Sequence, residues 1–186
     1  MSATETIAPA APLLPILVVP DPLLRKHARA VTPADYDEVR ALIPSMFATM
    51  YAAPGIGLAA PQVGRLLRVI VVDVAPDKVP APLALINPEV VAESDDKCAR
   101  EEGCLSLPEQ YAEVVRPSWV RVRYQDVDGV KHEVEADGLL ATCLQHEIDH
   151  LNGVQFVDYL SPLKRNILLR KLAKEVKEQK ERRGRR

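Results

Sequence analysis

A His-Glu-x-x-His pattern at residues 146–150 is the clearest indication of catalytic chemistry in the sequence. On a helix, residues four apart share a face, so His146 and His150 can direct two imidazoles at one metal ion. Glu147 lies about 100° round the helix from His146, where its carboxylate can take a proton from a bound water rather than ligate. The pattern is typical of metallohydrolases. It fits equally well an amphipathic helix that carries two histidines on its polar edge.

The surrounding sequence predicts the helix that this chemistry requires. Asp137 is a suitable N-cap and Gly153 a suitable C-terminal stop. Between them, apolar residues recur at helical spacing and would form its apolar side, namely Leu139, Leu140, Cys143, Leu144, Ile148 and Leu151.

A third metal ligand would separate the two interpretations. A metzincin would place a histidine six residues after His150, but that position is Phe156. Asp158 and Glu175 are possible carboxylate ligands of the thermolysin kind, although nothing around them resembles a second motif helix. Upstream, Cys104 follows a glycine in what we expect to be a short loop.

Three blocks of sequence, in order, carry a family resemblance. They are Gly-Ile-Gly-Leu-Ala-Ala-Pro-Gln at 55–62, Glu-Gly-Cys-Leu-Ser at 102–106 and Gln-His-Glu-Ile-Asp-His-Leu-Asn-Gly at 145–153. They closely resemble the three motifs of the peptide deformylase family, with every fixed position matched. The resemblance runs from about Pro20 to the end of the chain. It implies a metallohydrolase that removes the formyl group from N-formylmethionine at the start of nascent peptides and releases formate.

The resemblance implies that Cys104, His146 and His150 hold one divalent metal ion. Three protein ligands leave a position for water, which is the catalytic rather than the structural arrangement. Such a metal lowers the pKa of its water to around neutrality, so that Glu147 can hold the proton and later pass it to the leaving amine. The family implies iron(II) as the natural metal, whereas the ligand set alone also suits zinc, nickel or cobalt.

The resemblance also assigns residues to the substrate. The oxyanion would be stabilised by the side-chain amide of Gln62 and the backbone N–H of Leu105. Taken alone, Gln62 could equally be a loop amide that caps backbone groups. The methionine pocket and the other substrate contacts would come from Ile56, Gly57, Gly103, Tyr111, Leu139 and Cys143. The backbone of Gly57 would pair the peptide as an added strand.

Three further residues in or near these motifs have roles that the motifs alone do not define. Cys143 could in principle ligate, but we favour the pocket, because one helix cannot easily aim positions i, i+3 and i+7 at one ion. Some bacterial deformylases carry arginine at the position of Tyr111, and other members carry tyrosine, so the details of contact with the substrate backbone depend on it. Glu102 is expected to orient the site from behind the ligands, through Arg116.

The remaining sequence predicts one α+β domain. A chain of 186 residues that is 47% hydrophobic is long enough for a proper core, and no apolar run approaches the ~20 residues of a membrane helix. We expect antiparallel or mixed strands around the motif helix. One N-terminal helix should start at Thr32 as its N-cap and bury a single apolar stripe. One C-terminal helix should start near Ser161, with Ile167 on its inner face. Strands are expected at 16–19, 67–74, 83–86, 89–93, 112–115, 119–124 and 131–136. Asn87-Pro88 should split the third from the fourth, and the last two should form a hairpin through the turn at 126–129.

Charged residues are distributed unevenly along the chain. Residues 161–186 carry 11 Lys or Arg against 3 Glu, a net charge of +8, while the other residues sum to −10. We therefore expect a flexible N-terminal tail at 1–13, a catalytic domain at 14–160 and a basic C-terminal helix and tail at 161–186. A basic tail favours a polyanionic partner, although a solvated helix with a frayed basic end explains the same composition. The resemblance implies docking on the ribosome near the exit tunnel through this helix.

Other partners and locations follow from composition. An odd count of three cysteines and a first segment without basic residues favour a reducing compartment, so we expect a cytoplasmic protein. We expect contact with neither a membrane nor a specific nucleic-acid sequence. Two alternatives to a deformylase are a related metal-dependent amidase or peptidase, and a catalytically silent homologue that binds ribosomes. The silent homologue ranks low, because Glu147, Gln62 and all three ligands are present.

Overall fold

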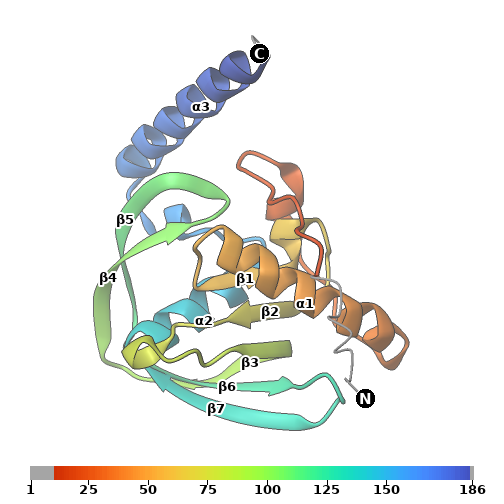
Figure 1. The fold of residues 1–186 in the computed structure, drawn as a ribbon. Coiled ribbons are helices and arrows are strands. Elements are labelled where there is room, and N and C mark those ends of the chain that lie inside the picture. The colour runs from red at the N-terminus through yellow and green to blue at the C-terminus, as the bar shows by residue number, and fades with distance from the viewer. Residues whose placement is uncertain (1–10, 185–186) are drawn as a thin grey trace.

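The computed structural model describes residues 11–184 and has the expected α+β architecture (Figure 1). Its three α-helices are α1 (Tyr36–Ala52), α2 (Gly138–Leu151) and α3 (Pro162–Gly184). Its seven strands are β1 (Gly57–Ala59), β2 (Val69–Val72), β3 (Leu83–Glu93), β4 (Lys97–Cys104), β5 (Leu107–Pro117), β6 (Trp119–Gln125) and β7 (Lys131–Asp137). Short 3-10 turns join several of them. Of the helices in residues 11–184, none has the length and apolar character needed to cross a membrane.

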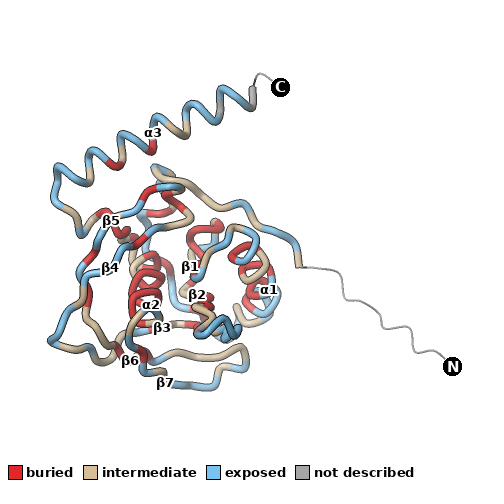
Figure 2. The backbone as a smooth tube through the Cα atoms, turned by 60° about the vertical axis from the view of Figure 1, so that its left-hand side comes forward, coloured by how far each residue is buried: buried red, intermediate tan, exposed pale blue. Residues whose placement is uncertain are grey.

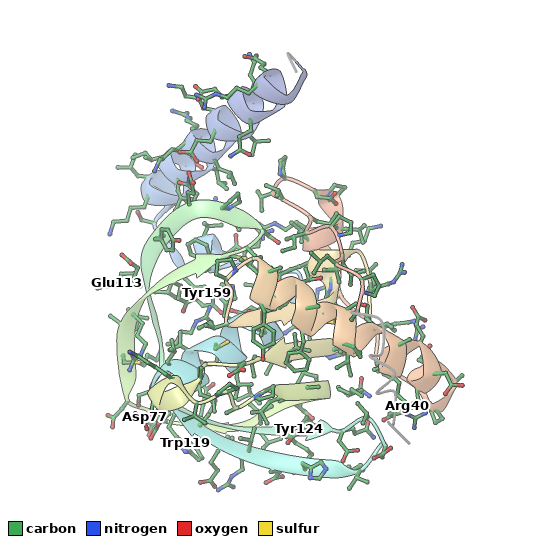
Figure 3. All side chains as sticks on the ribbon, in the orientation of Figure 1. Arg40, Asp77, Glu113, Trp119, Tyr124 and Tyr159 are labelled. Atoms are coloured by element: carbon green, nitrogen blue, oxygen red, sulfur yellow. The ribbon has the colours of Figure 1, made fainter. Side chains whose placement is uncertain are left out.

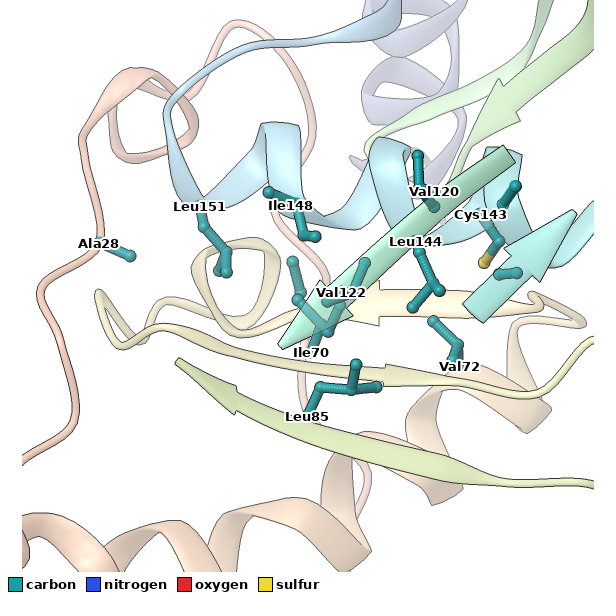
Figure 4. Packing of buried hydrophobic residues seen from close by; sticks show 13 residues of the cluster. Ala28, Ile70, Val72, Leu85, Val120, Val122, Cys143, Leu144, Ile148 and Leu151 are labelled. Atoms are coloured by element: carbon teal, nitrogen blue, oxygen red, sulfur yellow. The ribbon is translucent and has the colours of Figure 1, made fainter. Parts of the chain in front are cut away.

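An antiparallel five-stranded sheet, in the order β1-β2-β3-β6-β7, forms the middle layer. Side chains alternate across a strand, so Val69 and Val71 of β2 pack with α1, while Ile70 and Val72 pack with α2. Figure 4 shows the α2 side of this core, where Leu144 meets β-branched residues of the sheet. The predicted central helix is confirmed, and it is buried along almost its whole length (Figure 2).

The predicted start of the N-terminal helix and the predicted hairpin of the last two strands are confirmed. The Asp35 carboxylate accepts from the backbone N–H and the hydroxyl of Thr32, each at 2.8 Å, at a 3-10 turn that leads into α1. The periodic apolar stripe of that helix is buried. The hairpin of β6 and β7 closes through the turn at Gly129, whose backbone N–H bonds to Asp126.

The block around Cys104 was expected to be a loop, and that expectation is wrong. Residues 97–104 form strand β4, which pairs with β5 in a separate two-stranded antiparallel sheet, and only Leu105 and Ser106 turn between them. The strand is mostly polar and exposed, so it carries no hydrophobic alternation, and its partner strand supplies the hydrogen bonds that make it regular. Cys104 is consequently held at the end of a strand.

Three further expectations need correction. Residues 16–19 form no strand, because Leu17 bonds to Gln62 and Val19 to Ser106, two separate segments rather than one partner strand. The predicted break at Asn87 is bridged within β3: its φ of 51° makes a bulge, and its side chain bonds both backbone groups of Val31. Ile167, expected on the inner face of α3, is 59% exposed.

Helix α3 begins close to its predicted start and packs by one face only. Leu168 and Leu172 are buried in a cluster with Leu107 of β5 and with Phe156, while the distal part extends away from the rest of the molecule (Figure 1). Figure 3 shows side chains projecting from several sides of that part. The division into a 14–160 domain and a 161–186 segment stays a prediction, and most of the expected 1–13 tail lies outside the described residues.

Gly153 provides a test of how tightly α2 is joined to the N-terminal segment. Its φ is +70° and a Cβ there would approach the carbonyl oxygen of Arg25 to 2.5 Å. Gly64 has a φ of +80° and open space around it. The substitution Gly64→Ala should therefore cost only the left-handed backbone term, about 1–2 kcal/mol, and Gly153→Ala clearly more. Urea unfolding curves measure both, and equal losses would show that the contact with Arg25 is unimportant.

Candidate metal centre

Three side chains from two elements converge beside α2. His146 and His150 are one helical turn apart and buried, and Cys104 reaches them from the end of β4. One ligand atom from each of the three lies within 4.8 Å of the others. The Sγ atom of Cys104 is 3.2 Å from Nε2 of His150. The structure therefore brings together the ligands predicted from positions more than 40 residues apart.

A buried ionic chain orients the first of these histidines. Nδ1 of His146 lies 2.8 Å from a carboxylate oxygen of Glu102, and because a carboxylate only accepts, Nδ1 donates and Nε2 is left to face the cluster. Arg116 donates to both oxygens of Glu102, at 2.6 and 3.0 Å. It also donates to Asp149, at 2.8 Å. The expected contact between Glu102 and Arg116 is thus observed, and it fixes the orientation of the imidazole.

The two histidines differ electrostatically. Burial opposes the charged form of His146, but hydrogen bonds to Cys104 and Glu102 outweigh burial and hold its pKa well above the usual range. Burial, helped by the charge on His146, holds the pKa of His150 well below the usual range. Because an imidazole ligates a metal through a neutral nitrogen, the low pKa of His150 favours ligation, whereas the raised pKa of His146 makes cation binding compete with a proton.

Glu147 lies next to these ligands and is almost fully buried. Burial is the main reason that its pKa is raised to about 7. Its Oε2 atom, like Nδ1 of His150, has no hydrogen-bond partner among the described residues. A carboxyl group with this pKa can both accept and return a proton near neutrality.

These features meet the requirements of a divalent metal ion. One sulfur and two imidazole nitrogens suit zinc, iron, cobalt or nickel. Buried polar atoms without partners are costly, so an unpaired carboxylate oxygen beside three ligand atoms indicates space for a bound group. The residues present therefore fit a catalytic metal.

Gln62 joins the first and second sequence blocks. Its Oε1 accepts from the backbone N–H of Ala59, at 2.8 Å. Its Nε2 donates to Ser106 Oγ at 3.1 Å and lies 3.5 Å from Cys104 Sγ. The side chain thus both caps backbone and points its amide N–H groups at the metal centre. Ser106 was missed as a site residue: its backbone N–H donates to Cys104 Sγ at 3.4 Å, and its place within the second block was the only available signal.

A hollow of about 660 Å³ lies over the centre. Most of the predicted site residues line it, namely Ile56, Gly57, Gln62, Gly103, Cys104, Leu105, Tyr111, His146 and Glu147. Pro108, Glu109 and Gln110 also line it and were not anticipated. Leu139 lines a different hollow, with Trp119. Cys143 sits directly behind Gly57, where a Cβ would approach its Sγ to 2.8 Å. Pocket roles for Leu139 and Cys143 stay predictions.

The fold and the site together are those of a metal-dependent hydrolase. The antiparallel sheet packs against helix α2, which carries the two histidines, and the β4–β5 hairpin places the thiol of Cys104 beside them. The buried carboxyl group of Glu147 lies next to these ligands. Comparison with known proteins identifies the family.

The family model described as polypeptide deformylase matches residues 13–166. A peptide deformylase of Mesorhizobium japonicum is 52% identical over 168 residues, which cover 90% of this chain and 95% of the relative. One of Methylocella silvestris is 56% identical over 170 residues, which cover 89% and 86%. The crystal structure of a peptide deformylase from Legionella pneumophila superposes with a TM-score of 0.84 at 48% identity, covering 90% of this chain and 98% of that one.

The chain belongs to the polypeptide deformylase family. It is an enzyme that removes the N-formyl group from the formylmethionine of nascent peptides. The family is metal-dependent, and the structure contains a group of residues that can hold the metal.

The ionic chain behind His146 gives a direct prediction. Removing the carboxylate in Glu102→Ala frees the imidazole and leaves Arg116 with Asp149 as its remaining carboxylate partner, so metal affinity should fall about 10–100-fold. Competition with a chelator of known affinity measures this. Glu101→Ala is the control, since its side chain is exposed on the neighbouring position of β4, and it should bind metal like the parent. Unchanged affinity in the Glu102 variant would remove the orienting role.

Proposed function

We propose that this chain carries out deformylation with a single divalent metal ion held by Cys104, His146 and His150, with iron(II) as the natural metal. The observation that carries the proposal is the convergence of these three ligand atoms within 4.8 Å of one another, beside a hollow that Cys104, His146 and Glu147 line. Zinc, nickel and cobalt suit the same ligand set, and the preference for iron rests on the family resemblance.

In this proposal the bound ion supplies Lewis-acid activation of a water molecule and of the formyl oxygen. Glu147 would accept a proton from the attacking water and would then donate that proton to the leaving amine. Its raised pKa, about 7, suits both transfers.

Two hydrogen-bond donors would stabilise the negative charge that develops on the formyl oxygen. The amide of Gln62 faces the cluster beside Cys104, and the backbone N–H of Leu105 belongs to the same hairpin turn. One donor of this kind typically contributes about 3–4 kcal/mol to the transition state. Gly57 would pair the peptide backbone, because β1 is an edge strand and lines the hollow.

Formate release from an N-formylmethionyl peptide tests the role of Glu147. Under anaerobic conditions with iron(II), or with nickel(II), the parent should turn the peptide over, and Glu147→Ala should lose about 10²–10⁴-fold in kcat. Metal content must be measured in both proteins, because the proposal requires that the variant still binds one ion. A metal-loaded variant with parental activity would exclude Glu147 as the proton carrier.

We also propose that α3 docks on the ribosome, which places the enzyme in the cytoplasm beside chains under synthesis. At 3.6 residues per turn, Arg170, Lys174 and Lys177 lie opposite the buried Leu168 and Leu172. These cations are exposed, as are Leu163 and Ile167 on the same face. A basic surface with apolar residues between the charges suits a complex of RNA and protein.

Charge reversal tests this docking better than truncation, because removing α3 would uncover Leu107 and Phe156 of the core. The double variant Arg170→Glu and Lys177→Glu should weaken sedimentation with ribosomes at low salt by at least about ten-fold. Lys97→Glu and Lys131→Glu, exposed on other elements, form the control. Equal binding of the two double variants would rule out α3 as the docking element.

A further inference from the structure

One wall of the substrate hollow is a short stretch of β5. Pro108, Glu109, Gln110 and Tyr111 form that wall, and residues 53–57 form another. His146 and Glu147 are buried and form the floor. A peptide whose formyl group reaches Glu147 must leave between these two walls, so the 108–111 stretch, here called the rim, faces the residues that follow the formylmethionine.

The backbone conformation of the rim depends on contacts with other parts of the molecule. Glu109 has a φ of +59°, a left-handed backbone that a non-glycine residue keeps only where its surroundings enforce it. Tyr111 is 64% exposed and pairs in register with Gly103 across the hairpin. The anchor is Gln110, which is only 2% exposed although it is polar.

The partner of Gln110 comes from the C-terminal helix. Its Nε2 donates to a carboxylate oxygen of Glu175 at 2.7 Å, and more weakly to the carbonyl of Pro108 at 3.4 Å. A short hydrogen bond to a charged acceptor is among the stronger kinds. It joins two residues 65 positions apart, and Glu175 lies beyond residues 13–166, which the family model matches.

Packing fixes Glu175 in place. Leu172 and Val176, on either side of it, belong to the apolar cluster that contains Leu107 and Ala112 of β5. The flanking residues of the rim and of α3 are therefore packed together, and the pair of Gln110 and Glu175 lies between them. Lys171 is 3.9 Å from the other oxygen of Glu175.

We propose that Glu175 is a positioning residue for substrate recognition, which holds the rim through Gln110 and so governs affinity for peptide residues beyond the formylmethionine. The C-terminal helix thereby forms part of the substrate site without touching the substrate. The proposal rests on the proposed function only for the path of the peptide through the hollow.

Two peptides and three variants test it. The nickel-loaded enzyme is assayed on N-formyl-Met-Ala and on N-formyl-Met-Ala-Ser-Ala, as the parent and as Glu175→Ala, Glu175→Gln and Glu178→Ala. Loss of the acceptor in Glu175→Ala should raise KM for the tetrapeptide about five-fold, more than it raises KM for the dipeptide or lowers kcat. Glutamine at position 175 keeps an acceptor and should restore most of the tetrapeptide affinity. Glu178, one turn away and 4.0 Å from Lys174, is the matched control and should behave like the parent.

Hydrogen exchange of the same proteins gives a readout that does not depend on turnover. Amides in residues 105–112 should exchange faster in Glu175→Ala than in the parent and in Glu178→Ala. An unchanged ratio of the two KM values together with unchanged exchange overturns the proposal, as does an equal loss of kcat on both peptides. If the parent turns over neither peptide, the proposed function fails, and the exchange of residues 105–112 alone then decides whether Glu175 holds the rim.

Discussion

The buried ion pair between Glu102 and Arg116 is the interaction on which the site depends. It joins the two strands of the β4–β5 hairpin from within, and it extends to α2 at both His146 and Asp149. Burial opposes the charge on Arg116, but Glu102 and Asp149 outweigh that effect and hold its pKa above the ordinary value. Because an unpaired charge in this place would be very costly, hairpin and helix must meet in one arrangement, which brings Cys104 to His150.

Burial of apolar side chains offsets the cost of burying the polar groups of the site. One face of α2 packs Leu144, Ile148 and Leu151 against the sheet, and burying such side chains typically contributes about 1.5–3 kcal/mol each. The opposite face carries the two histidines, and Glu147 lies between the two faces. The desolvation of these polar groups opposes folding. Gly57 lets strand β1 approach this polar face, since a Cβ would meet the carboxylate of Glu147 and the thiol of Cys143. The same helix therefore stabilises the fold and carries the chemistry.

The sequence predicted correctly those features that depend on interactions between residues close together in the chain. The spacing of His146 and His150, the capping at Thr32 and the hairpin turn at Gly129 all act within a few residues, and the structure has all of them. Strand β4 was missed because a polar strand is defined by its partner, not by its own pattern. The chain at Ile16 looks like a strand but bonds to two segments. Gln110 and Glu175 gain their positions from a contact between residues distant in sequence, so no local pattern could indicate their roles.

X-ray absorption spectroscopy of the enzyme loaded with one equivalent of zinc tests the central claim most directly. The account predicts one sulfur at about 2.3 Å and two nitrogens at about 2.0–2.1 Å from the metal. The sulfur signal should vanish in Cys104→Ser and persist in Cys98→Ser, since Cys98 lies at the far end of β4. A spectrum without sulfur in the parent, or sulfur that survives the loss of Cys104, would contradict the assignment of these three ligands.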